Sequence, residues 1–348
     1  MPRIYLDHAA TTPMRPEAKA AMAAALERWA NPSSPHAEGR AARAALEDAR
    51  ARIKAALGWR GELIFTSGAS EALGIALNRA KLKRRIVSAV EHDAVFRAAP
   101  DAAVVPVRAG EVDRGALVAL LAGGPAVVAI QHTNSETGTA LLPFAGSNEV
   151  VDDVHAAGGI VLMDCAQSLG RVPPQVDLAV LSAHKLGGPP GIGALLVRDL
   201  GLLDPVGGHE FGYRQGTENL PAILGFAAAV EVMSAGWRVD AEAMAEVKNA
   251  LWRVGEVIAP GVQCAHILAV AMPGTSAAAQ LIRFDAMGFA VSAGSACSSG
   301  TLKRSRALAA FGVDEDTAAR TIRVSFGWTT TKQEIEAFRD AWLEVAGA

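Results

Sequence analysis

Residues 160–185 read IVLMDCAQSLGRVPPQVDLAVLSAHK and contain two apolar runs, each followed by polar residues. Neither run alternates with polar residues, which is typical of strands in a parallel sheet that is covered on both faces. Asp164 ends the first run, and Lys185 follows the second. Because ligands of open α/β sheets bind beyond the carboxyl ends of the strands, we expect Asp164 and Lys185 to lie at the same edge.

The same pattern of strand and helix continues through the first two-thirds of the chain. The expected strands are 62–66, 85–89, 126–131, 160–164, 177–182 and 192–197, and the expected helices are 16–29, 37–57, 69–79 and 147–157. Strands that alternate with helices in this way indicate a three-layer α/β domain with a mainly parallel sheet.

After Gly225 the pattern changes and predicts a smaller α+β domain. Its expected elements are an amphipathic helix at 241–258, strands at 263–272 and 321–326, and helices at 275–287 and from residue 332. We therefore predict a large domain over residues 14–238, and a small domain formed by residues 1–13 and 239–348.

Composition limits the classes of protein to which the chain can belong. It has 348 residues, of which 51% are hydrophobic and 20% charged, as expected for a compact globular protein. The net charge of −3 gives no overall positive field for nucleic acid or anionic lipid. The first eight residues are too short and too polar for the apolar region expected of a signal sequence, and no apolar run reaches the length of a membrane span. We expect a cytoplasmic protein that binds neither nucleic acid nor membrane.

Three cysteines, Cys165, Cys264 and Cys297, are widely spaced and form no C-x-x-C pair. This pattern argues for free thiols in a reducing compartment, and against a disulfide framework or a zinc site. Cys297 lies in VSAGSACSSG (291–300), whose small side chains have little packing power. We expect this cysteine to be accessible to solvent and available for sulfur chemistry.

Lys185 and Asp164 are candidates for carbonyl chemistry. A lysine in a pocket of low dielectric constant has a depressed pKa and attacks a carbonyl readily, so Lys185 could carry a carbonyl cofactor as a Schiff base. It could equally be an exposed charge in a loop. Asp164 could pair with a pyridinium nitrogen and keep it protonated, or it could cap a helix or occupy a surface turn.

Four further features are weak when each is taken alone. Residues 66–71 run from a strand into a helix and could bind a phosphate with Ser70, although an ordinary capped turn is the preferred interpretation. His92 could stack on a planar ring or simply begin a helix. Asn31 lies in a rigid polar loop that could be only a turn. Arg323 would clamp a carboxylate if it faces inward, and would be a solvated charge otherwise.

In combination, these residues resemble the cysteine desulfurases of the NifS/IscS type, in the class V aminotransferase group of fold-type I pyridoxal-phosphate enzymes. The resemblance extends from residue 5 to about residue 327. The blocks that carry it are YLDHAATTP (5–13), NPSS (31–34), FTSGASE (65–71), EH (91–92), NSETG (134–138), DCAQ (164–167), SAHK (182–185), RQGT (214–217) and SAC (295–297).

The resemblance implies roles for individual residues. Lys185 would hold pyridoxal 5'-phosphate and move the α-proton of L-cysteine, His92 would stack on the cofactor ring, and Cys297 would take the sulfur as a persulfide and release alanine. The other residues implied to bind the cofactor are Ala69, Ser70, Asn134, Asp164, Gln167, Ser182, His184 and, from the second subunit of a homodimer, Thr217. Asn31 and Arg323 would bind the substrate carboxylate.

Some points depart from the family or leave alternatives open. Ser135 stands where the family usually has a second asparagine, and Trp328 stands where basic residues are familiar. The sulfur acceptor could be an iron–sulfur scaffold or a tRNA-thiolation protein. A selenocysteine lyase, a transaminase and a non-catalytic homologue are the rival interpretations. Cys297 argues against a transaminase, and its presence together with Lys185, Asp164 and His92 argues against a non-enzyme.

Overall fold

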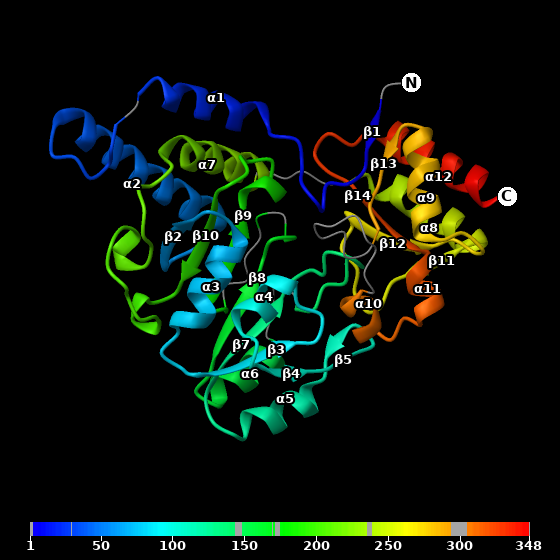
Figure 1. The fold of residues 1–348 in the computed structure, drawn as a ribbon, viewed down its shortest axis with the longest axis horizontal. Helices are drawn as coiled ribbons and strands as arrows, with labels where there is room; N and C mark the ends of the chain where they lie inside the picture. Colours follow the sequence, from blue (N-terminus) through cyan, green and yellow to red (C-terminus); the bar gives the residue numbers. More distant parts are fainter. Residues whose placement is uncertain are drawn as a thin grey trace.

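A computed structural model describes residues 3–28, 30–142, 148–168, 170, 175–234, 239–293 and 305–347 (Figure 1). At its centre is a seven-stranded sheet with the strand order β2-β10-β9-β8-β7-β3-β4. The strands are β2 (Glu62–Thr66), β3 (Arg84–Ser88), β4 (Ala103–Val105), β7 (Ala126–Gln131), β8 (Ile160–Asp164), β9 (Leu178–Ser182) and β10 (Gly193–Val197).

The sheet is mainly parallel, as the sequence predicts. β9, β8, β7, β3 and β4 run in parallel, and β10 runs antiparallel to both β9 and β2. The exception has a simple cause, because only residues 183–192 connect β9 to β10 and a parallel crossover needs about a dozen residues or more. Asp164 on β8 is in register with Val180 on β9, so the chain after β9 emerges beside Asp164.

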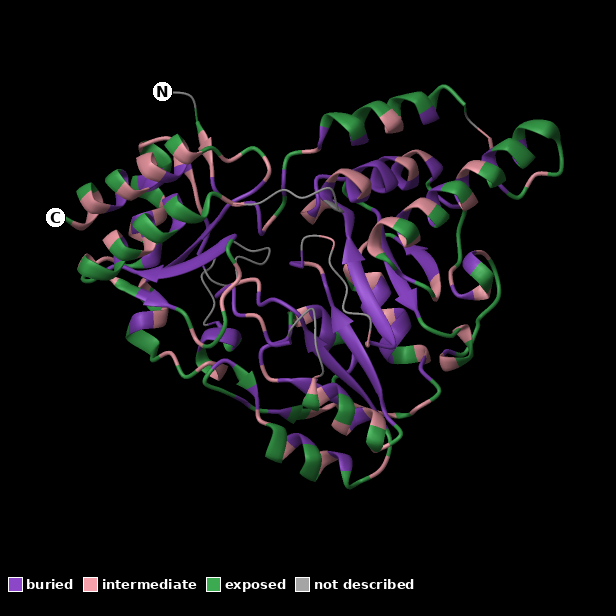
Figure 2. Ribbon diagram, turned by 180° about the vertical axis from the view of Figure 1, so that it is seen from behind, coloured by how far each residue is buried: buried purple, intermediate pink, exposed green. Residues whose placement is uncertain are grey.

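Helices cover both faces of this sheet and give the predicted three layers. Alternate residues of β2 divide between two buried clusters, with Leu63 and Phe65 in the first and Ile64 in the second. The first cluster contains side chains of α2 (Ala37–Leu57), α5 (Arg114–Leu121), α6 (Glu149–Ala156) and α7 (Leu220–Ser234), and the second those of α3 (Ala69–Arg79) and α4 (Asp93–Ala98). Figure 2 shows the buried strands enclosed between partly exposed helices. Helix α1 (Pro16–Leu26) packs against α7.

A second group of elements lies beside the sheet, toward the C-terminus (Figure 1). It contains the antiparallel sheet β11-β12-β14 and the parallel pair β1-β13. Its strands are β1 (Ile4–Tyr5), β11 (Glu256–Ile258), β12 (Ile267–Ala271), β13 (Phe289–Ala290) and β14 (Thr321–Ser325). Its helices are α8 (Ala241–Val254), α9 (Ala277–Ala286), α10 (Arg306–Ala310), α11 (Glu315–Arg320) and α12 (Lys332–Ala346).

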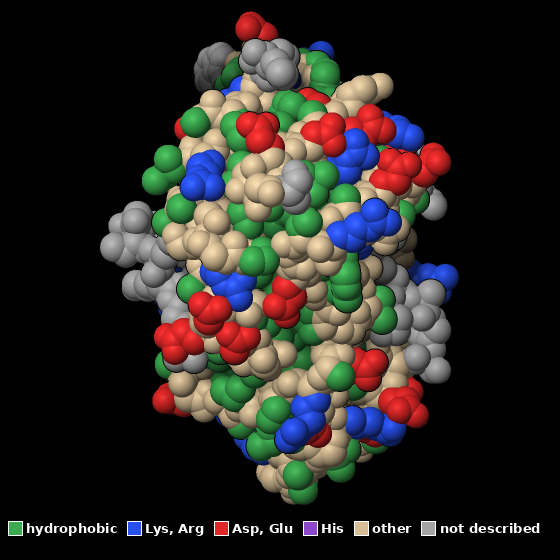
Figure 3. All heavy atoms as spheres, turned by 90° about the vertical axis from the view of Figure 1, so that its right-hand side faces the viewer, with side chains coloured by type: hydrophobic (Ala, Val, Ile, Leu, Met, Phe, Trp, Pro, Cys, Tyr) green, Lys and Arg blue, Asp and Glu red, His purple; other side chains and the backbone are tan. Residues whose placement is uncertain are grey.

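Most of these elements, though not α10 and α11, share a buried cluster in which the rings of Phe284, Phe338 and Trp342 contact one another and to which Leu6 from the N-terminal segment also belongs. The face that this group presents to solvent carries basic and acidic side chains next to one another (Figure 3). The short hairpin β5 (Val107–Arg108) and β6 (Glu111–Val112) completes the strands. Within the described part of the chain, no helix combines the length and apolar character that crossing a bilayer requires.

Several predicted elements differ in extent from the structure, two of them in the C-terminal part by several residues. The helix expected at 241–258 ends at Val254, because Gly255 adopts extended dihedral angles (φ −147°, ψ −169°) and the chain continues as β11. The strand expected at 263–272 begins only at Ile267, because Gln263 instead pairs with Thr139. Cys264 therefore precedes the strand and is partly exposed. Strands β3, β9 and β10 begin or end one residue away from their predicted bounds. Helices α1, α6 and α9 are shorter than predicted.

Candidate functional site

A cavity of about 790 Å³ opens beyond the carboxyl ends of β7, β8 and β9. Segments from β2–α3, β3–α4 and β14 complete its wall, so residues far apart in sequence meet there. The predicted site residues that line it are Ala69, Ser70, His92, Asn134, Asp164, Gln167, Ser182, His184, Lys185 and Arg323. The structure therefore gathers most of the residues that the sequence nominated into one pocket.

Asp164 and Lys185 form the floor of this pocket. Asp164 is buried, and its Oδ1 accepts a hydrogen bond from the Ala166 amide at 2.9 Å. Burial raises the pKa of Asp164, while the nearby charges of His92 and Lys185 oppose that shift. The Lys185 Nζ donates to the carbonyl oxygens of Ala9 and Ala10, the latter at 2.8 Å. A buried carboxyl group of this kind is stabilised in its ionised form by a cationic partner, such as a protonated ring nitrogen.

His92 contributes a neutral ring to the pocket wall. It is the N-cap of α4, where its Nδ1 accepts a hydrogen bond from the Ala94 amide at 3.1 Å. This contact assigns the ring proton to Nε2. Burial lowers the pKa of His92, which favours the neutral form. A neutral imidazole can stack on a flat aromatic ligand without adding a charge to the floor.

The start of α3 has the features of an anion site and forms another part of the wall. Its N-cap residue is Gly68, whose φ of +154° is accessible to glycine and which has no side chain to cover the first amides of the helix. Ser70, Ser182 and His184 line the cavity together with Gly68. Burial lowers the pKa of His184 to about 4, so this ring is a neutral hydrogen-bonding group at neutral pH. Free amides and the helix dipole favour a phosphate at such a position.

Arg323 on β14 closes the pocket from the side of the C-terminal elements. Its Nη2 donates to Asp7 Oδ1 at 2.7 Å and its Nη1 to the Ser135 carbonyl at 3.0 Å. The side chain is buried and faces inward, which is the orientation that the clamp prediction requires. Its Nε has no hydrogen-bond partner among the described residues. The guanidinium group therefore retains one unused buried donor, and a carboxylate entering the pocket could accept a hydrogen bond from it.

Asn31 and Thr217, two of the predicted residues, do not line this cavity. Asn31 is exposed, and its Oδ1 accepts a hydrogen bond from the Ser33 amide at 2.8 Å. Thr217 is exposed in the loop that precedes α7. Cys297 belongs to residues 294–304, which lie outside the described residues.

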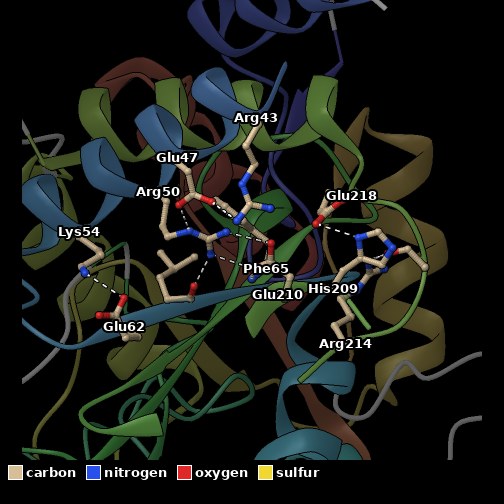
Figure 4. A network of polar contacts seen from close by, with 12 residues as sticks. Arg43, Glu47, Arg50, Lys54, Glu62, Phe65, His209, Glu210, Arg214 and Glu218 are labelled. Atoms are coloured by element: carbon tan, nitrogen blue, oxygen red, sulfur yellow. Dashed lines mark hydrogen bonds and ion pairs between the residues drawn. The ribbon is translucent and has the colours of Figure 1, made fainter. Parts of the chain in front are cut away.

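The loop that carries Thr217 is fixed to the sheet by a buried ion pair (Figure 4). Arg50 on α2 donates to both carboxylate oxygens of Glu210, at 2.8 and 2.9 Å, and the Phe65 amide on β2 donates to the same carboxylate at 2.7 Å. Further along the loop, Arg214 pairs with Glu71 at 3.2 Å in the first turn of α3. Thr217 is therefore exposed three residues after a side chain that is paired with the first turn of α3.

Sequence reasoning missed Glu91, a buried acid in the pocket wall. Its Oε1 accepts hydrogen bonds from Ser88 Oγ and from the Gln131 amide, the latter at 2.7 Å, and its Oε2 has no partner among the described residues. Burial raises the pKa of Glu91 to about 8, and the negative charge of Asp164 adds to the shift. The sequence did contain a signal for Glu91, because this acid follows β3 and directly precedes His92. An acid at the ligand-binding end of a strand seldom has a purely structural role.

The two described cysteines differ in environment. Cys165 is fully buried, as expected for a packing residue, and burial raises its pKa far above the usual range. Cys264 is partly exposed. Burial of its thiol opposes ionisation, but the charge and hydrogen bonding of His266 lower its pKa overall. Neither residue lines the cavity.

Comparison with known proteins shows what this chain is similar to. The model of the family described as aminotransferase class-V matches residues 4–338. A protein named cysteine desulfurase IscS from Dictyoglomus turgidum is 33% identical, over 95% of this chain and 91% of its own length. A cysteine desulfurase from Frankia sp. is 36% identical, over 97% of this chain and 90% of its own length.

Solved structures agree with the sequence comparison. A NifS-like protein from Rickettsia africae has a TM-score of 0.87 at 29% identity, covering 99% of this chain and 100% of its own. A structure described as SspA in complex with cysteine has a TM-score of 0.75 at 27% identity, covering 93% and 98% of the two chains.

Proposed function

Since this chain belongs to the aminotransferase class-V family, we propose that it is a cysteine desulfurase that takes sulfur from L-cysteine, leaves L-alanine and holds the sulfur on Cys297 as a persulfide. Its fold is that of the fold-type I pyridoxal-phosphate enzymes of this family. The observation that carries the proposal is the meeting of Asp164, Lys185, His92 and the α3 start in one cavity.

The pocket fits pyridoxal 5'-phosphate, the cofactor of the family. When bound, this group supplies an electron sink for the α-carbon of an amino acid. Asp164 would face its ring nitrogen, His92 its ring, and Gln167 its ring hydroxyl. The remaining contacts would come from Asn134 on the ring side, and from Ala69, Ser70, Ser182 and His184 at the phosphate.

Lys185 is the residue that would carry protons. Its Nζ is held by two backbone carbonyls from the segment that follows β1, so the amine is positioned before substrate arrives. The positive charge of Lys185 opposes the rise in the pKa of Asp164 and adds to the lowering of the pKa of His92. From this position the amine can hold the cofactor carbonyl and later move the substrate α-proton.

Arg323 and Cys297 would act on the two ends of the substrate. The unused Nε donor of Arg323 would bind the carboxylate, with the rest of the guanidinium group held by Asp7 and the Ser135 carbonyl. The Cys297 thiolate would form a bond to the substrate sulfur while the carbon–sulfur bond breaks. The electron pair of that bond stays with the carbon, which takes up a proton to give alanine.

A single-turnover experiment tests this function. We expect the purified holoenzyme to convert L-cysteine to alanine and to carry one extra sulfur on Cys297, located by peptide mass spectrometry. Cys297→Ala should retain the cofactor and its spectral change on adding L-cysteine, yet form no persulfide. Cys165→Ala and Cys264→Ala serve as matched thiol controls and should stay active. Undiminished alanine production by Cys297→Ala, or a keto acid as product, would contradict the proposal.

The proposal extends to partners. The exposed Thr217, on a loop braced against α3, is consistent with a homodimer in which it reaches the phosphate site of the second subunit. If a monomeric form bound the cofactor as tightly as the dimer, this part would be wrong. Asn31 remains predicted to bind the substrate carboxylate together with Arg323. The acceptor would be a cytoplasmic iron–sulfur scaffold or tRNA-thiolation protein, identified by transfer of ³⁵S from the persulfide.

We also propose that the two domains divide at residues 14–238 against 1–13 and 239–348. This division is supported by the separate buried clusters, because Leu6 packs with the C-terminal elements and not with the seven-stranded sheet. Selenocysteine lyase activity is the second candidate for the reaction. Parallel assays with L-cysteine and L-selenocysteine distinguish the two by their ratio of kcat/KM.

A further inference from the structure

Arg306 is the first residue of α10 and follows Ser305, the first described residue after segment 294–304. Its Nη2 donates to the Glu91 carbonyl at 2.9 Å and to Asp93 Oδ1 at 2.8 Å. These two acceptors stand on either side of His92 in the sequence. One guanidinium group from the C-terminal part of the chain therefore binds the backbone carbonyl of the residue before His92 and the side-chain carboxylate of the residue after it.

Two neighbouring contacts make this attachment more than a surface ion pair. The Arg306 guanidinium lies 3.7 Å from the ring centre of Phe96 on α4, within the range of a cation–π contact. Ser305 is buried, caps α10 through the Leu308 amide at 3.0 Å, and donates its hydroxyl proton to Glu136 Oε2 at 2.6 Å. An exposed ion pair is weak on its own, and the Arg306–Asp93 pair is partly exposed. The combined set of contacts fixes the start of α10 against the pocket wall.

The other end of the same segment is fixed as well. Ser292 and Arg323 exchange two backbone hydrogen bonds, at 3.1 and 2.6 Å. Ser292, Arg306 and Arg323 all line the cavity. The described residues on both sides of segment 294–304, which contains Cys297, are therefore attached to the wall of the proposed active site.

We propose that Arg306 is a positioning residue that attaches the chain following Cys297 to the two residues flanking His92. The same guanidinium group would then hold both the start of α10, which follows the sulfur-accepting cysteine in sequence, and the ring-stacking histidine. The inference rests on the proposed function and names a residue for its sulfur step. In this role Arg306 acts through His92 and through the start of α10.

The first test needs no activity. Amide hydrogen exchange of the apoprotein should show segments 93–98 and 306–310 exchanging faster together in Arg306→Ala than in the wild type. Arg114→Ala is the matched control, because Arg114 has similar exposure and pairs with Glu149 and Asp153 on helix α6. Arg306→Lys keeps the charge but loses the planar fork, so it should restore only part of the protection. Unchanged exchange in both segments of Arg306→Ala would overturn the inference.

The second test is kinetic and separates a positioning role from a general loss of stability. We expect Arg306→Ala to bind a full complement of cofactor and to keep the KM for L-cysteine within about threefold, while persulfide formation on Cys297 slows about tenfold or more, since small misplacements cost large factors in rate. Asp93→Asn should also slow persulfide formation, by a smaller factor. The double variant, Arg306→Ala with Asp93→Asn, should slow it by less than the product of the two single-variant factors.

The outcomes can be told apart. A wild-type enzyme that forms no persulfide would contradict the proposed function. The hydrogen-exchange experiment would still decide whether Arg306 couples segments 93–98 and 306–310. A normal persulfide rate in Arg306→Ala, or an equal loss in Arg114→Ala, would show that Arg306 has no positioning role.

Discussion

The floor of the pocket is made by residues that directly follow strands, whereas its rim is made by segments from both ends of the chain. On the floor, Asp164 and Ser182 end the parallel strands β8 and β9, and the sheet alone determines their spacing. At the rim, Asp7 and Arg323 are separated by most of the sequence; they form an ion pair beside backbone hydrogen bonds that join the N-terminal segment and Ser292 to β14. The floor is therefore held within one sheet, while the rim depends on contacts between segments from the two ends of the chain.

The largest expected effect comes from removing the amine on the floor. Lys185→Ala should lower turnover by about 10²–10⁴-fold or more, because the proton carrier and the attachment point of the cofactor disappear together. Borohydride reduction of the wild type should fix the cofactor to Lys185, as peptide mapping can show. Lys83→Ala is a suitable control, since Lys83 is exposed and pairs with Asp204.

A label on any other lysine, or turnover within a few fold of the wild type in Lys185→Ala, would contradict the assignment of the chemistry to the floor of the pocket. It would mean that the floor residues do not carry the chemistry and that the rim has to be reconsidered as the reactive region.

Glu91, in the pocket wall, allows a test of how strongly the pocket is shielded from water. The pKa of Glu91 is raised to about 8 by burial, against an ordinary value near 4.5. Between these values the folded protein holds a proton that the unfolded chain has released. The unfolding free energy should therefore fall as pH rises from 4.5 to 8, by up to about 1.4 kcal/mol per pH unit from this group.

Glu91→Gln should flatten this dependence, because an amide cannot ionise. Urea unfolding of the apoprotein at several pH values measures the slope. The exposed acid Glu17 provides the matched variant, Glu17→Gln, which should leave the slope unchanged. An identical slope in wild type and Glu91→Gln would show that Glu91 is not shielded from water.

The contrast between floor and rim also explains what the sequence could predict. Asp164, Lys185 and His92 were identifiable because each follows an apolar strand, and parallel strands bring their carboxyl ends to one edge. Glu91 follows β3 in the same way, but its burial, which sets it apart from a surface acid, is visible only in the folded structure. The pairing of Asp7 with Arg323 depends on how the C-terminal elements pack against the sheet, and neither residue's neighbours in sequence contain that information.

Element boundaries failed for a related reason. The amphipathic pattern of 241–258 is the same whether residues 256–258 continue the helix or pair with β12, and only the tertiary partner decides. The very apolar α7 was not predicted, because a helix buried on all sides shows little amphipathic periodicity.

The smallest expected effect lies where floor and rim meet, at Ser135. Its side chain lines the cavity and its carbonyl accepts a hydrogen bond from Arg323 at 3.0 Å. Ser135→Asn preserves this backbone contact and adds an amide toward the cofactor. One added hydrogen bond contributes about 0.5–1.5 kcal/mol, so cofactor affinity should stay unchanged or rise by up to about tenfold. Ser135→Ala is the control, and its cofactor affinity should not rise. Fluorescence titration of the apoprotein with pyridoxal phosphate measures both. A clear loss of affinity in the asparagine variant would show that the rim has repacked around the smaller serine and no longer accepts the family residue.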